Sequence, residues 1–449
     1  MAIPQGATPA AQPPHAARPL ADGLVLAMHF LPAERDPLVE AFWSRLAATL
    51  VARGHALTLL STTAVADPAL QTIDVPFEIT AFAQRFPNHP ARTIAIGEDE
   101  ITNTVSWYRC SGDVARKNLQ LAHAFIGDLL STLRPAAVLG WQDLVPLTRV
   151  VREQAAAAGI PYWAGERGWV RNTLLFDLAG AHALGEAYAS LASRRRRRRY
   201  RPTSEVLHRL HQRATQAANL DRYPATARLE RDALLCKLGV PRDARVAVLF
   251  THCEPGISAN SARAPAELHD ASAEVLAQRI EALGAALLAR GFWLLVQEHP
   301  LNVSAGRCLN LPSSPRLLRV RENVNSLLDA CDLSLYTLAS LQFDAAFLDK
   351  PLGLLSRSAL YDDGNPPFMG DYPSADAFLD AVLDSAAWPE RQRRMRTHVA
   401  FHYEELLLDI EPTAMDASAT EWADHLTQFK RPVDHEFPER VERFLADWG

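Results

Sequence analysis

Apolar runs of strand length alternate with segments of helical spacing along most of this chain. Gly23–Phe30 is an apolar run, Pro37–Arg53 carries apolar residues at helical spacing, and His55–Ser61 is a second apolar run. Gly54 stands directly after the helical segment, where a glycine commonly ends a helix. A strand, a helix and a strand in this order predict a βαβ unit and therefore a parallel sheet.

The same alternation returns twice more along the chain. After a less regular region over residues 62–110, the spacing predicts helices and strands in turn over Val114–Leu133, Ala136–Gly140, Leu144–Ala158 and Ile160–Ala164. Leu184–Leu238 looks helical, and then a strand over Arg245–Thr251 and a helix over Ala264–Arg290 begin a second series, with Gly291 ending that helix. Two such halves joined by a helical stretch predict two Rossmann-like domains that face each other across a cleft.

The length of 449 residues exceeds what one ordinary core holds, so two domains are expected. The predicted division is a disordered tail at 1–20, an N-terminal Rossmann-like domain at 21–200, a helical linker at 201–240, a C-terminal nucleotide-binding domain at 241–385 and C-terminal helices at 386–449. The helices after Ser374 are compatible with packing on either half.

Charge and cysteine content exclude several classes of protein. The net charge is −6 and the pI is near 6.2, which argues against general nucleic-acid binding. The five cysteines are scattered without CxxC spacing, which fits a reducing cytoplasm and offers no zinc site. No apolar stretch approaches the roughly 20 residues of a membrane span, and the N-terminus lacks the apolar core of a secretory signal.

Polar side chains follow the strands of the second half. The apolar run from Trp293 ends at His299-Pro300, the next ends at Thr337 and Ser340, and a third is followed by Arg357. Thr337 and Ser340 are expected to open an amphipathic helix, and a helix start offers free N–H groups and a favourable dipole to phosphate. The carboxyl ends of strands hold ligands in open α/β sheets, so this segment predicts a nucleotide or phosphosugar site, with Asp344 further along the helix and peripheral.

A carboxylate follows the last predicted strand of the first half. Glu166 lies in the segment GERGWVRN, where Gly165 and Gly168 are expected to form a tight turn that presents it at the edge of the sheet. Such a carboxylate suits general base or nucleophile chemistry at a sugar centre. Arg171 is a candidate to bind a carboxylate of the donor or acceptor.

Two further groups have lower rank. Glu254, Asn260 and Ser261 follow the first strand of the second half and are candidates to face the cleft. The block of like charge consists of Arg194, Arg195, Arg196, Arg197, Arg198 and Arg199. A block of this kind is most often a solvated surface, and its functional alternative is contact with anionic lipid or a polyanionic glycan.

The sequence predicts neither a metal nor a dinucleotide cofactor. Glu98-Asp99-Glu100 is the tight acidic cluster of the chain, and no spaced set of histidines or cysteines accompanies it. A P-loop and a GxGxxG fingerprint are both absent, which argues against a kinase or a dinucleotide oxidoreductase.

Together these motifs resemble the bacterial capsule polysaccharide biosynthesis family, which includes transferases that add 3-deoxy-D-manno-oct-2-ulosonic acid (Kdo) in a β linkage. The family's E-x-G-aromatic-aliphatic-Arg segment is matched by Glu166–Arg171, and its HP dipeptide after a strand by EHPLN. The hydroxyl-bearing helix start, the GKP-like turn and the aliphatic-x-aromatic tail are similar to TLAS, DKP and GLLSRSALYD. Order and approximate spacing agree over residues 136–365, about half of the chain.

The resemblance implies a GT-B glycosyltransferase that needs no metal, uses a CMP-activated sugar acid such as CMP-Kdo, and acts on a glycan or glycolipid acceptor. It places the nucleotide near His299, Pro300 and Ser340, and the carboxylate of the E-x-G segment at the anomeric carbon. Arg167 stands where related enzymes often have a second acidic residue, so either Glu166 takes the carboxylate role or the chain is altered in activity. Asp349 stands where glycine is usual in the GKP-like turn.

The resemblance also implies a cytoplasmic enzyme, and the arginine block adds peripheral attachment to the inner face of the bacterial inner membrane. Two alternatives stay open. Arg167 and the arginine block are also compatible with a non-catalytic glycan- or lipid-binding component of the same pathway. A transferase with a UDP-sugar or polyol-phosphate donor would use the same site.

Overall fold

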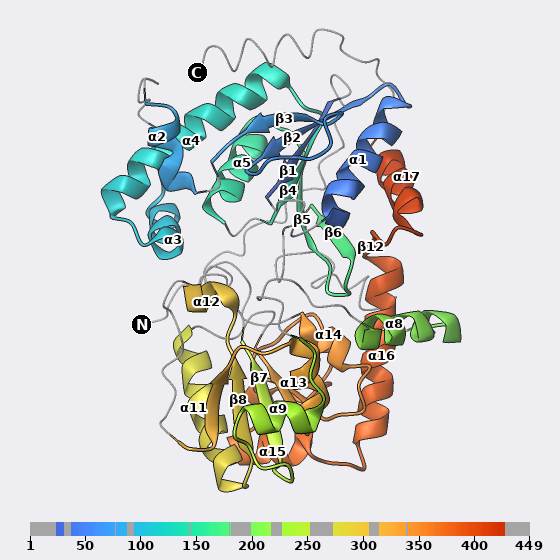
Figure 1. The fold of residues 1–449 in the computed structure, drawn as a ribbon. Helices are drawn as coiled ribbons and strands as arrows, with labels where there is room; N and C mark the ends of the chain where they lie inside the picture. Colours follow the sequence, from blue (N-terminus) through green and yellow to red (C-terminus); the bar gives the residue numbers. More distant parts are fainter. Residues whose placement is uncertain are drawn as a thin grey trace, which may run out of the picture.

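Two β-sheets, each covered by helices, make up most of the described chain (Figure 1). The computed structural model describes residues 24–30, 37–76, 78–87, 94–142, 145–178, 180, 199–216, 227–251, 273–304, 314–337 and 340–426. We call the first sheet with its helices the N-terminal domain and the second sheet with its helices the C-terminal domain. Within these residues, no helix combines the length and the apolar character that crossing a bilayer requires.

The N-terminal domain opens with the predicted βαβ unit. Its elements are β1 (Leu24–His29), α1 (Pro37–Val51), β2 (Ala56–Ser61), β3 (Gln71–Asp74), η1 (Ile79–Ala81), α2 (Phe82–Arg85), α3 (Glu98–Tyr108), α4 (Gly112–Leu133), β4 (Ala137–Trp141), α5 (Pro146–Ala157), β5 (Tyr162–Arg167) and β6 (Thr173–Asp177). β1 pairs in parallel with β2 and with β4, which confirms the parallel sheet. Gly54 has the positive φ of 77° that suits a glycine after a helix.

The sheet of the N-terminal domain has the strand order β12-β6-β5-β4-β1-β2-β3. The five strands from β5 to β3 are parallel, with β1 in the middle, which is the order of a Rossmann half. β6 then turns back and pairs antiparallel with β5, so that Glu166 lies opposite Leu175.

The C-terminal domain repeats this topology with five parallel strands. Its elements are β7 (Val246–Phe250), α11 (Ala273–Ala289), β8 (Trp293–Gln297), α12 (Pro300–Ser304), β9 (Leu317–Val320), α13 (Val324–Ala330), β10 (Leu333–Tyr336), α14 (Leu341–Ala345), β11 (Leu352–Leu354), η3 (Met369–Asp371) and α15 (Ala375–Val382). The strand order β11-β10-β7-β8-β9 again has the first strand in the middle. The two-domain α/β fold with Rossmann-like sheets is therefore confirmed.

The last segments of the chain return to the N-terminal domain. Along the chain, two helices connect the strands of the first sheet to those of the second, namely α8 (Ser204–Gln216) and α9 (Arg231–Lys237). Three more elements follow α15, namely α16 (Trp388–Glu405), β12 (Leu408–Asp409) and α17 (Met415–Leu426). β12 pairs with β6, and α17 lies beside α1 (Figure 1). α15, α16 and α17 lie where helices were expected after Ser374, up to the last described residue at 426, whereas the short strand β12 was not predicted.

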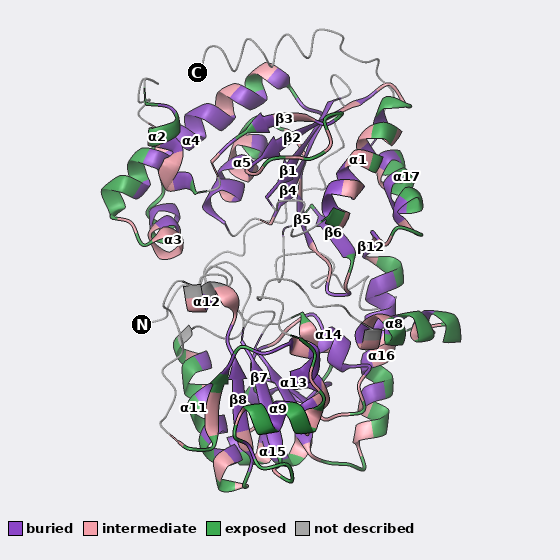
Figure 2. Cartoon of the chain, viewed as in Figure 1, coloured by how far each residue is buried: buried purple, intermediate pink, exposed green. Residues whose placement is uncertain are grey.

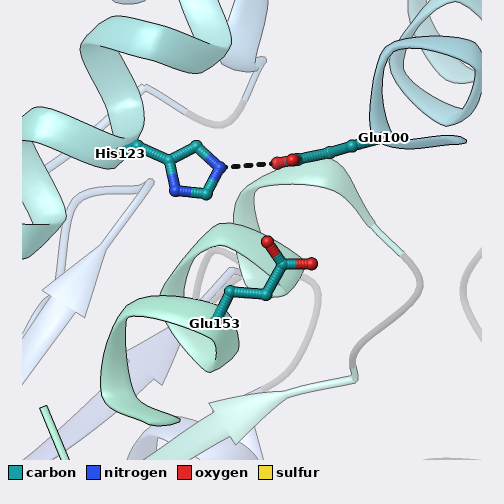
Figure 3. A group of neighbouring side chains, drawn as sticks. All are labelled: Glu100, His123 and Glu153. Carbon is teal, nitrogen blue, oxygen red and sulfur yellow. Dashed lines mark hydrogen bonds and ion pairs between the residues drawn. The ribbon is translucent and has the colours of Figure 1, made fainter. Parts of the chain in front are cut away.

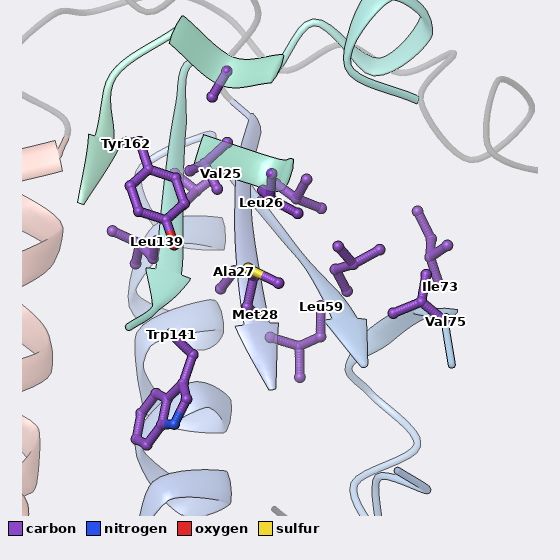
Figure 4. Close-up of a cluster of buried hydrophobic side chains, with 14 of the residues drawn as sticks. Val25, Leu26, Ala27, Met28, Leu59, Ile73, Val75, Leu139, Trp141 and Tyr162 are labelled. Carbon is purple, nitrogen blue, oxygen red and sulfur yellow. The ribbon is translucent and has the colours of Figure 1, made fainter. Parts of the chain in front are cut away.

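The strands of both sheets consist almost entirely of buried residues (Figure 2), and their apolar side chains form the cores. In the N-terminal domain, Leu26, Met28 and Leu139 are fully buried, and Figure 4 shows them beside Leu59 and Ile73 of the neighbouring strands. This core also includes Met415 and Ala419 of α17. Burial of each such large side chain contributes about 1.5–3 kcal/mol, so α17 is held by the N-terminal domain rather than by the domain it follows in sequence.

Several elements that the sequence did not predict are short or lie at sheet edges. The region 62–110 contains β3 and α3, and the second half contains β9, α12 and α13. β3 and β9 are the outermost strands on their side of each sheet. Edge strands carry mixed polar and apolar residues, as in QTID and LLRV, so their periodicity is weak. The expected tail at 1–20, and the residues 264–272 of a predicted helix, lie outside the described residues.

Candidate functional site

The carboxyl ends of the parallel strands face one another across the two domains. The hairpin that leaves the carboxyl end of β5 reaches the C-terminal domain, where Arg171 pairs with Asp344 at an Nε–Oδ2 distance of 2.9 Å. Asp344 belongs to α14, which follows the carboxyl end of β10. Because all parallel strands of a sheet end at the same edge, the carboxyl edges of both sheets lie on the side where the domains meet.

In the C-terminal domain, the chain changes direction between β7 and β10. β8 and β9 lie on one side of β7, and β10 and β11 lie on the other. Ligands of open α/β sheets bind outside the carboxyl ends of the strands at such a switch point. The predicted residues His299, Thr337 and Arg357 all follow strands at this edge.

His299 lies between β8 and α12, and α12 lies on the side of the C-terminal domain that faces the N-terminal domain (Figure 1). Its backbone N–H donates to the Thr251 hydroxyl at 3.1 Å, and its carbonyl accepts from the Asn302 N–H at 2.9 Å. The His299 residue is partly exposed. Pro300 is the first residue of α12, a position where its missing N–H costs nothing. Thr251, which the sequence did not single out, fixes the backbone that carries the imidazole.

Thr337 and Ser340 lie beside the switch point. Thr337 is fully buried, and its N–H donates to the Phe250 carbonyl at 3.2 Å. Ser340 is the N-cap residue of α14, is exposed, and makes no capping hydrogen bond with its side chain. The Ser340 hydroxyl is therefore not committed to the helix start.

The helix after Ser340 is short and buried, which corrects the expectation of an amphipathic helix. α14 spans five residues, and Gln342 through Ala345 are all buried. Its polar side chains find partners inside the protein, since Gln342 Oε1 accepts from the Ser358 hydroxyl at 2.6 Å and Asp344 pairs with Arg171. Asp344 is therefore a central contact of the site rather than a peripheral residue.

The Arg357 side chain is held in place by two aromatic rings and a carboxylate. Its guanidinium lies over the rings of Tyr361 and Phe368, at 5.4 and 5.3 Å from the centroids, and its Nη2 is 3.5 Å from Asp371 Oδ1. The Tyr361 hydroxyl donates to Asp371 at 2.6 Å. Burial, together with the Asp371 carboxylate, raises the pKa of Tyr361 to about 12, so this donor stays protonated over the physiological range. The aromatic rings hold the Arg357 guanidinium near the end of β11.

Glu166 occupies a different local structure from the one predicted. It is the fifth residue of the six-residue strand β5 and is 3% exposed. Gly165 and Gly168 have no positive φ, and the tight turn lies at residues 168–172, where Asn172 has a φ of 55°. The glycines are needed for space, because a Cβ at Gly165 would lie 2.5 Å from the Gly140 carbonyl oxygen, and one at Gly168 would lie 2.0 Å from Thr173 Oγ1.

Substituting Gly165 by alanine should destabilise the protein by about 1–3 kcal/mol, because the added methyl group meets backbone that cannot move away cheaply. Gly284 in α11 is a matched control, since its Cβ would meet Leu294 Cδ2 at an ordinary 3.7 Å. Gly284→Ala is expected to be neutral or stabilising, as for a glycine inside a helix. Urea midpoints of both variants test this prediction, and a wild-type midpoint for Gly165→Ala would contradict it.

Two residues in the turn of the β5–β6 hairpin, Trp169 and Val170, are buried against the C-terminal domain. Trp169 stacks on Phe343 with ring centroids 5.6 Å apart and meets His402 of α16 edge-on at 4.7 Å. Trp169 and Val170 belong to the same apolar core as the strands β7 and β10. The Arg213 side chain of α8 donates to the Arg171 carbonyl at 3.0 Å. The aromatic and aliphatic positions of the E-x-G segment therefore join the domains.

Arg171 is engaged by protein groups in this structure, and its role as a ligand for a substrate carboxylate stays a prediction. Its side chain is 8% exposed, its Nε pairs with Asp344, and its Nη2 donates to Asn325 Oδ1 at 3.3 Å. Burial raises the pKa of Asp344 more than the Arg171 guanidinium lowers it. The buried aspartate in LQFDAAF was the sequence signal that could have identified this partner.

The remaining candidates lie largely outside the described residues. Glu254, Asn260 and Ser261, and the arginines at 194–198, belong to segments that the structure does not describe. Arg199 is described and exposed. These positions stay predictions.

No family model and no curated protein matches this chain. Its fold is similar to solved structures that include KpsC β-Kdo transferases, other glycosyltransferases and nucleotide-sugar epimerases. A KpsC β-Kdo 2,4 transferase of Thermosulfurimonas dismutans is 17% identical with a TM-score of 0.39, over 65% of this chain and 87% of that chain. The glycosyltransferase SnogD of Streptomyces nogalater is 16% identical with a TM-score of 0.34, over 91% and 100% of the two chains. The UDP-GlcNAc 2-epimerase of Methanocaldococcus jannaschii, solved with UDP-GlcNAc and UDP, is 10% identical with a TM-score of 0.37, over 90% and 99%. These similarities concern the fold and assign no activity.

Proposed function

We propose that this chain is a metal-independent glycosyltransferase of capsule or surface-polysaccharide assembly. It would transfer Kdo or a similar sugar acid from a CMP-activated donor to a glycan or glycolipid acceptor. The observation that carries the proposal is the meeting of two carboxyl edges. One edge bears an imidazole, a hydroxyl and a guanidinium at His299, Ser340 and Arg357, and the other bears the carboxylate of Glu166.

The edge of the C-terminal domain suits the nucleotide. A CMP leaving group is an anion whose charge grows as the bond to the sugar breaks, and preorganised donors stabilise such charge most effectively. His299 and Ser340 offer an imidazole and a hydroxyl beside the switch point, and Arg357 adds a fixed positive charge. These three groups would compensate the leaving phosphate, which is the role that a metal has in many other transferases.

The carboxylate of Glu166 would act at the anomeric carbon. As a general base it would accept the proton of the acceptor hydroxyl while the acceptor oxygen bonds to the anomeric carbon. The bond from that carbon to the phosphate oxygen breaks, and its electron pair leaves with CMP. As a nucleophile, Glu166 would instead bond to the carbon first and be displaced by the acceptor in a second step. The arginine block at 194–199 is proposed to contact an anionic lipid surface or the acceptor.

Calorimetric titration with CMP, CDP and UDP tests the nucleotide site. We expect CMP to bind more tightly than UDP. We also expect Arg357→Ala to lower the affinity for CMP. Tighter binding of UDP would reassign the donor to a UDP-sugar. Absence of binding by all three nucleotides would overturn the transferase proposal and favour a non-catalytic glycan- or lipid-binding protein.

The variant Glu166→Gln separates catalysis from binding. It removes the proton acceptor but keeps nearly the same shape, so we expect unchanged CMP affinity and a loss of transfer from CMP-Kdo by about 100-fold or more. Glu421→Gln, on the exposed face of α17, is the control and should keep wild-type turnover. Wild-type turnover in Glu166→Gln would remove Glu166 from the mechanism and leave the nucleotide site intact.

A further inference from the structure

Three helices of the N-terminal domain bring one polar side chain each into a compact cluster. Glu100 comes from α3, His123 from α4 and Glu153 from α5, and one ligand atom of each lies within 4.8 Å of the others (Figure 3). His123 Nε2 is 2.7 Å from Glu100 Oε1. The acidic run Glu98-Asp99-Glu100 therefore has a histidine beside it, although that histidine is remote in sequence.

Two of the three side chains are buried. Glu100 is 3% exposed and His123 is 5% exposed, while Glu153 is partly exposed. Each lies on a helix whose apolar residues pack inward, for example Ile101 beside Glu100. Burial of an ionised carboxylate costs several kcal/mol unless a positive partner compensates it. The fold therefore holds these polar groups out of water, where their burial must be compensated by partners inside the cluster.

An arginine lies beside the carboxyl groups of the cluster. Arg149 donates to Glu153 Oε1 at 2.8 Å and to Asp99 Oδ2 at 2.5 Å. One guanidinium therefore serves two carboxylates, while the Glu100 carboxylate faces the His123 imidazole. The carboxyl groups of Asp99, Glu100 and Glu153 thus lie around a single guanidinium, and such a concentration of oxygen ligands is an environment that attracts a cation.

The ligand atoms match the chemistry of a first-row transition metal. One imidazole nitrogen and two carboxylate oxygens are the ligands of many three-residue zinc sites, whereas magnesium and calcium prefer oxygen alone. Tetrahedral coordination with bonds of about 2.0–2.1 Å places ligand atoms roughly 3.3 Å apart. The present spacings, from 2.7 Å to within 4.8 Å, lie on both sides of that value, so small side-chain rotations would complete the geometry.

The second ring nitrogen of His123 is also held. The Gln154 side-chain amide lies 2.9 Å from His123 Nδ1. Because the two ends of a glutamine amide are interchangeable by a flip, its oxygen can accept from Nδ1–H and leave the Nε2 lone pair for a metal. An outer partner of this kind typically orients a metal-binding histidine.

We propose that Glu100, His123 and Glu153 bind a divalent transition-metal ion of the zinc class, which joins α3, α4 and α5. The partial exposure of Glu153 leaves one side of the ion open to solvent, where water would complete the coordination. This site is separate from the groups proposed to act on the nucleotide sugar and does not depend on that function. The opposing interpretation is an imidazolium–carboxylate pair between His123 and Glu100 that needs no metal.

The test uses the full chain, stripped with a chelator and titrated with Zn²⁺ by calorimetry and with Co²⁺ by visible absorption. We expect one equivalent of Zn²⁺ to bind and to raise the unfolding temperature, and Co²⁺ to show ligand-field bands of low-coordinate geometry. His123→Gln, which can still hydrogen-bond to Glu100, should lose these bands and weaken Zn²⁺ binding by about 100-fold, at least as much as loss of an outer partner does.

Two further variants complete the test. Glu98→Gln is the matched control, because Glu98 is exposed in the same helix turn and pairs with Arg116 instead. It should keep wild-type metal affinity. Glu153→Gln, at the partly exposed position, should fold and still lose affinity, which covers the case in which His123→Gln does not fold. Wild-type metal affinity in Glu153→Gln, or Zn²⁺ binding no tighter than that of an exposed histidine such as His208, would overturn the proposal in favour of the ion pair.

Discussion

Replacing His299 by alanine is expected to abolish sugar transfer while the protein stays folded. The imidazole follows the carboxyl end of β8, close to the switch point between β7 and β10 where α/β sheets bind their ligands. If it binds the donor phosphate, its loss removes a charge-assisted contact that strengthens as the phosphate leaves. We expect turnover from CMP-Kdo to fall by at least about 100-fold, with weaker CMP binding.

The control for His299 is His208→Ala. His208 is exposed on α8, next to Gln212, and lies at none of the strand ends. It should keep wild-type turnover and wild-type circular dichroism, whereas His299→Ala should keep only the latter. Full turnover in His299→Ala would remove the histidine from the site and would sink the assignment of the nucleotide to this edge.

Breaking the Arg171–Asp344 pair is expected to destabilise the protein by about 3–5 kcal/mol, because either single substitution leaves a buried charge without its partner. Arg171→Met and Asp344→Leu test each side. The double variant removes both charges and should cost clearly less than the sum of the single variants. Urea unfolding of the four proteins measures this coupling, and strictly additive effects would contradict it.

The cost of Arg171→Met should also depend on pH. Burial already holds the pKa of Asp344 above its ordinary value of 3.8, and loss of Arg171 removes the interaction that lowers it. A raised folded-state pKa gives stability that is complete below the unfolded value and is lost as the pH rises through the folded value. The stability of Arg171→Met should therefore be closest to that of the wild type in acid, where Asp344 is protonated. It should fall below that of the wild type as the pH rises through the folded-state pKa of Asp344. Arg393→Met, in an exposed pair with Glu390, is the control and should leave both the stability and its pH dependence close to those of the wild type.

Local patterns were sufficient for the central strands and the long helices. β1, β2, β4, β7 and β8 are apolar over nearly their whole length, and their order along the chain with the intervening helices requires parallel pairing. The same order places His299, Thr337 and Arg357 at one edge. No contact information is needed for this, since the connection rules of parallel sheets determine which ends lie together.

Tertiary contacts decided the roles of individual side chains. Glu166 was expected in a turn, yet the antiparallel strand β6 extends β5 past it and buries it. Arg171 was expected to face a substrate, but it meets Asp344 at a distance of 173 positions in sequence. Trp169 was identified only as the aromatic position of the E-x-G segment. In the structure it stacks on Phe343 and so contributes to the contact between the two domains.

The sequence by itself determined the parallel strands of the two sheets, their order in the chain and the strand ends where a nucleotide site is expected, because the apolar pattern records which residues each strand and helix buries. Only the tertiary structure decided which polar groups meet, as in the pair of Arg171 with Asp344 and the cluster of Glu100, His123 and Glu153. Such meetings depend on how separate helices and strands pack. A buried charge is stable only next to its partner, and the partner's position in sequence leaves no local pattern.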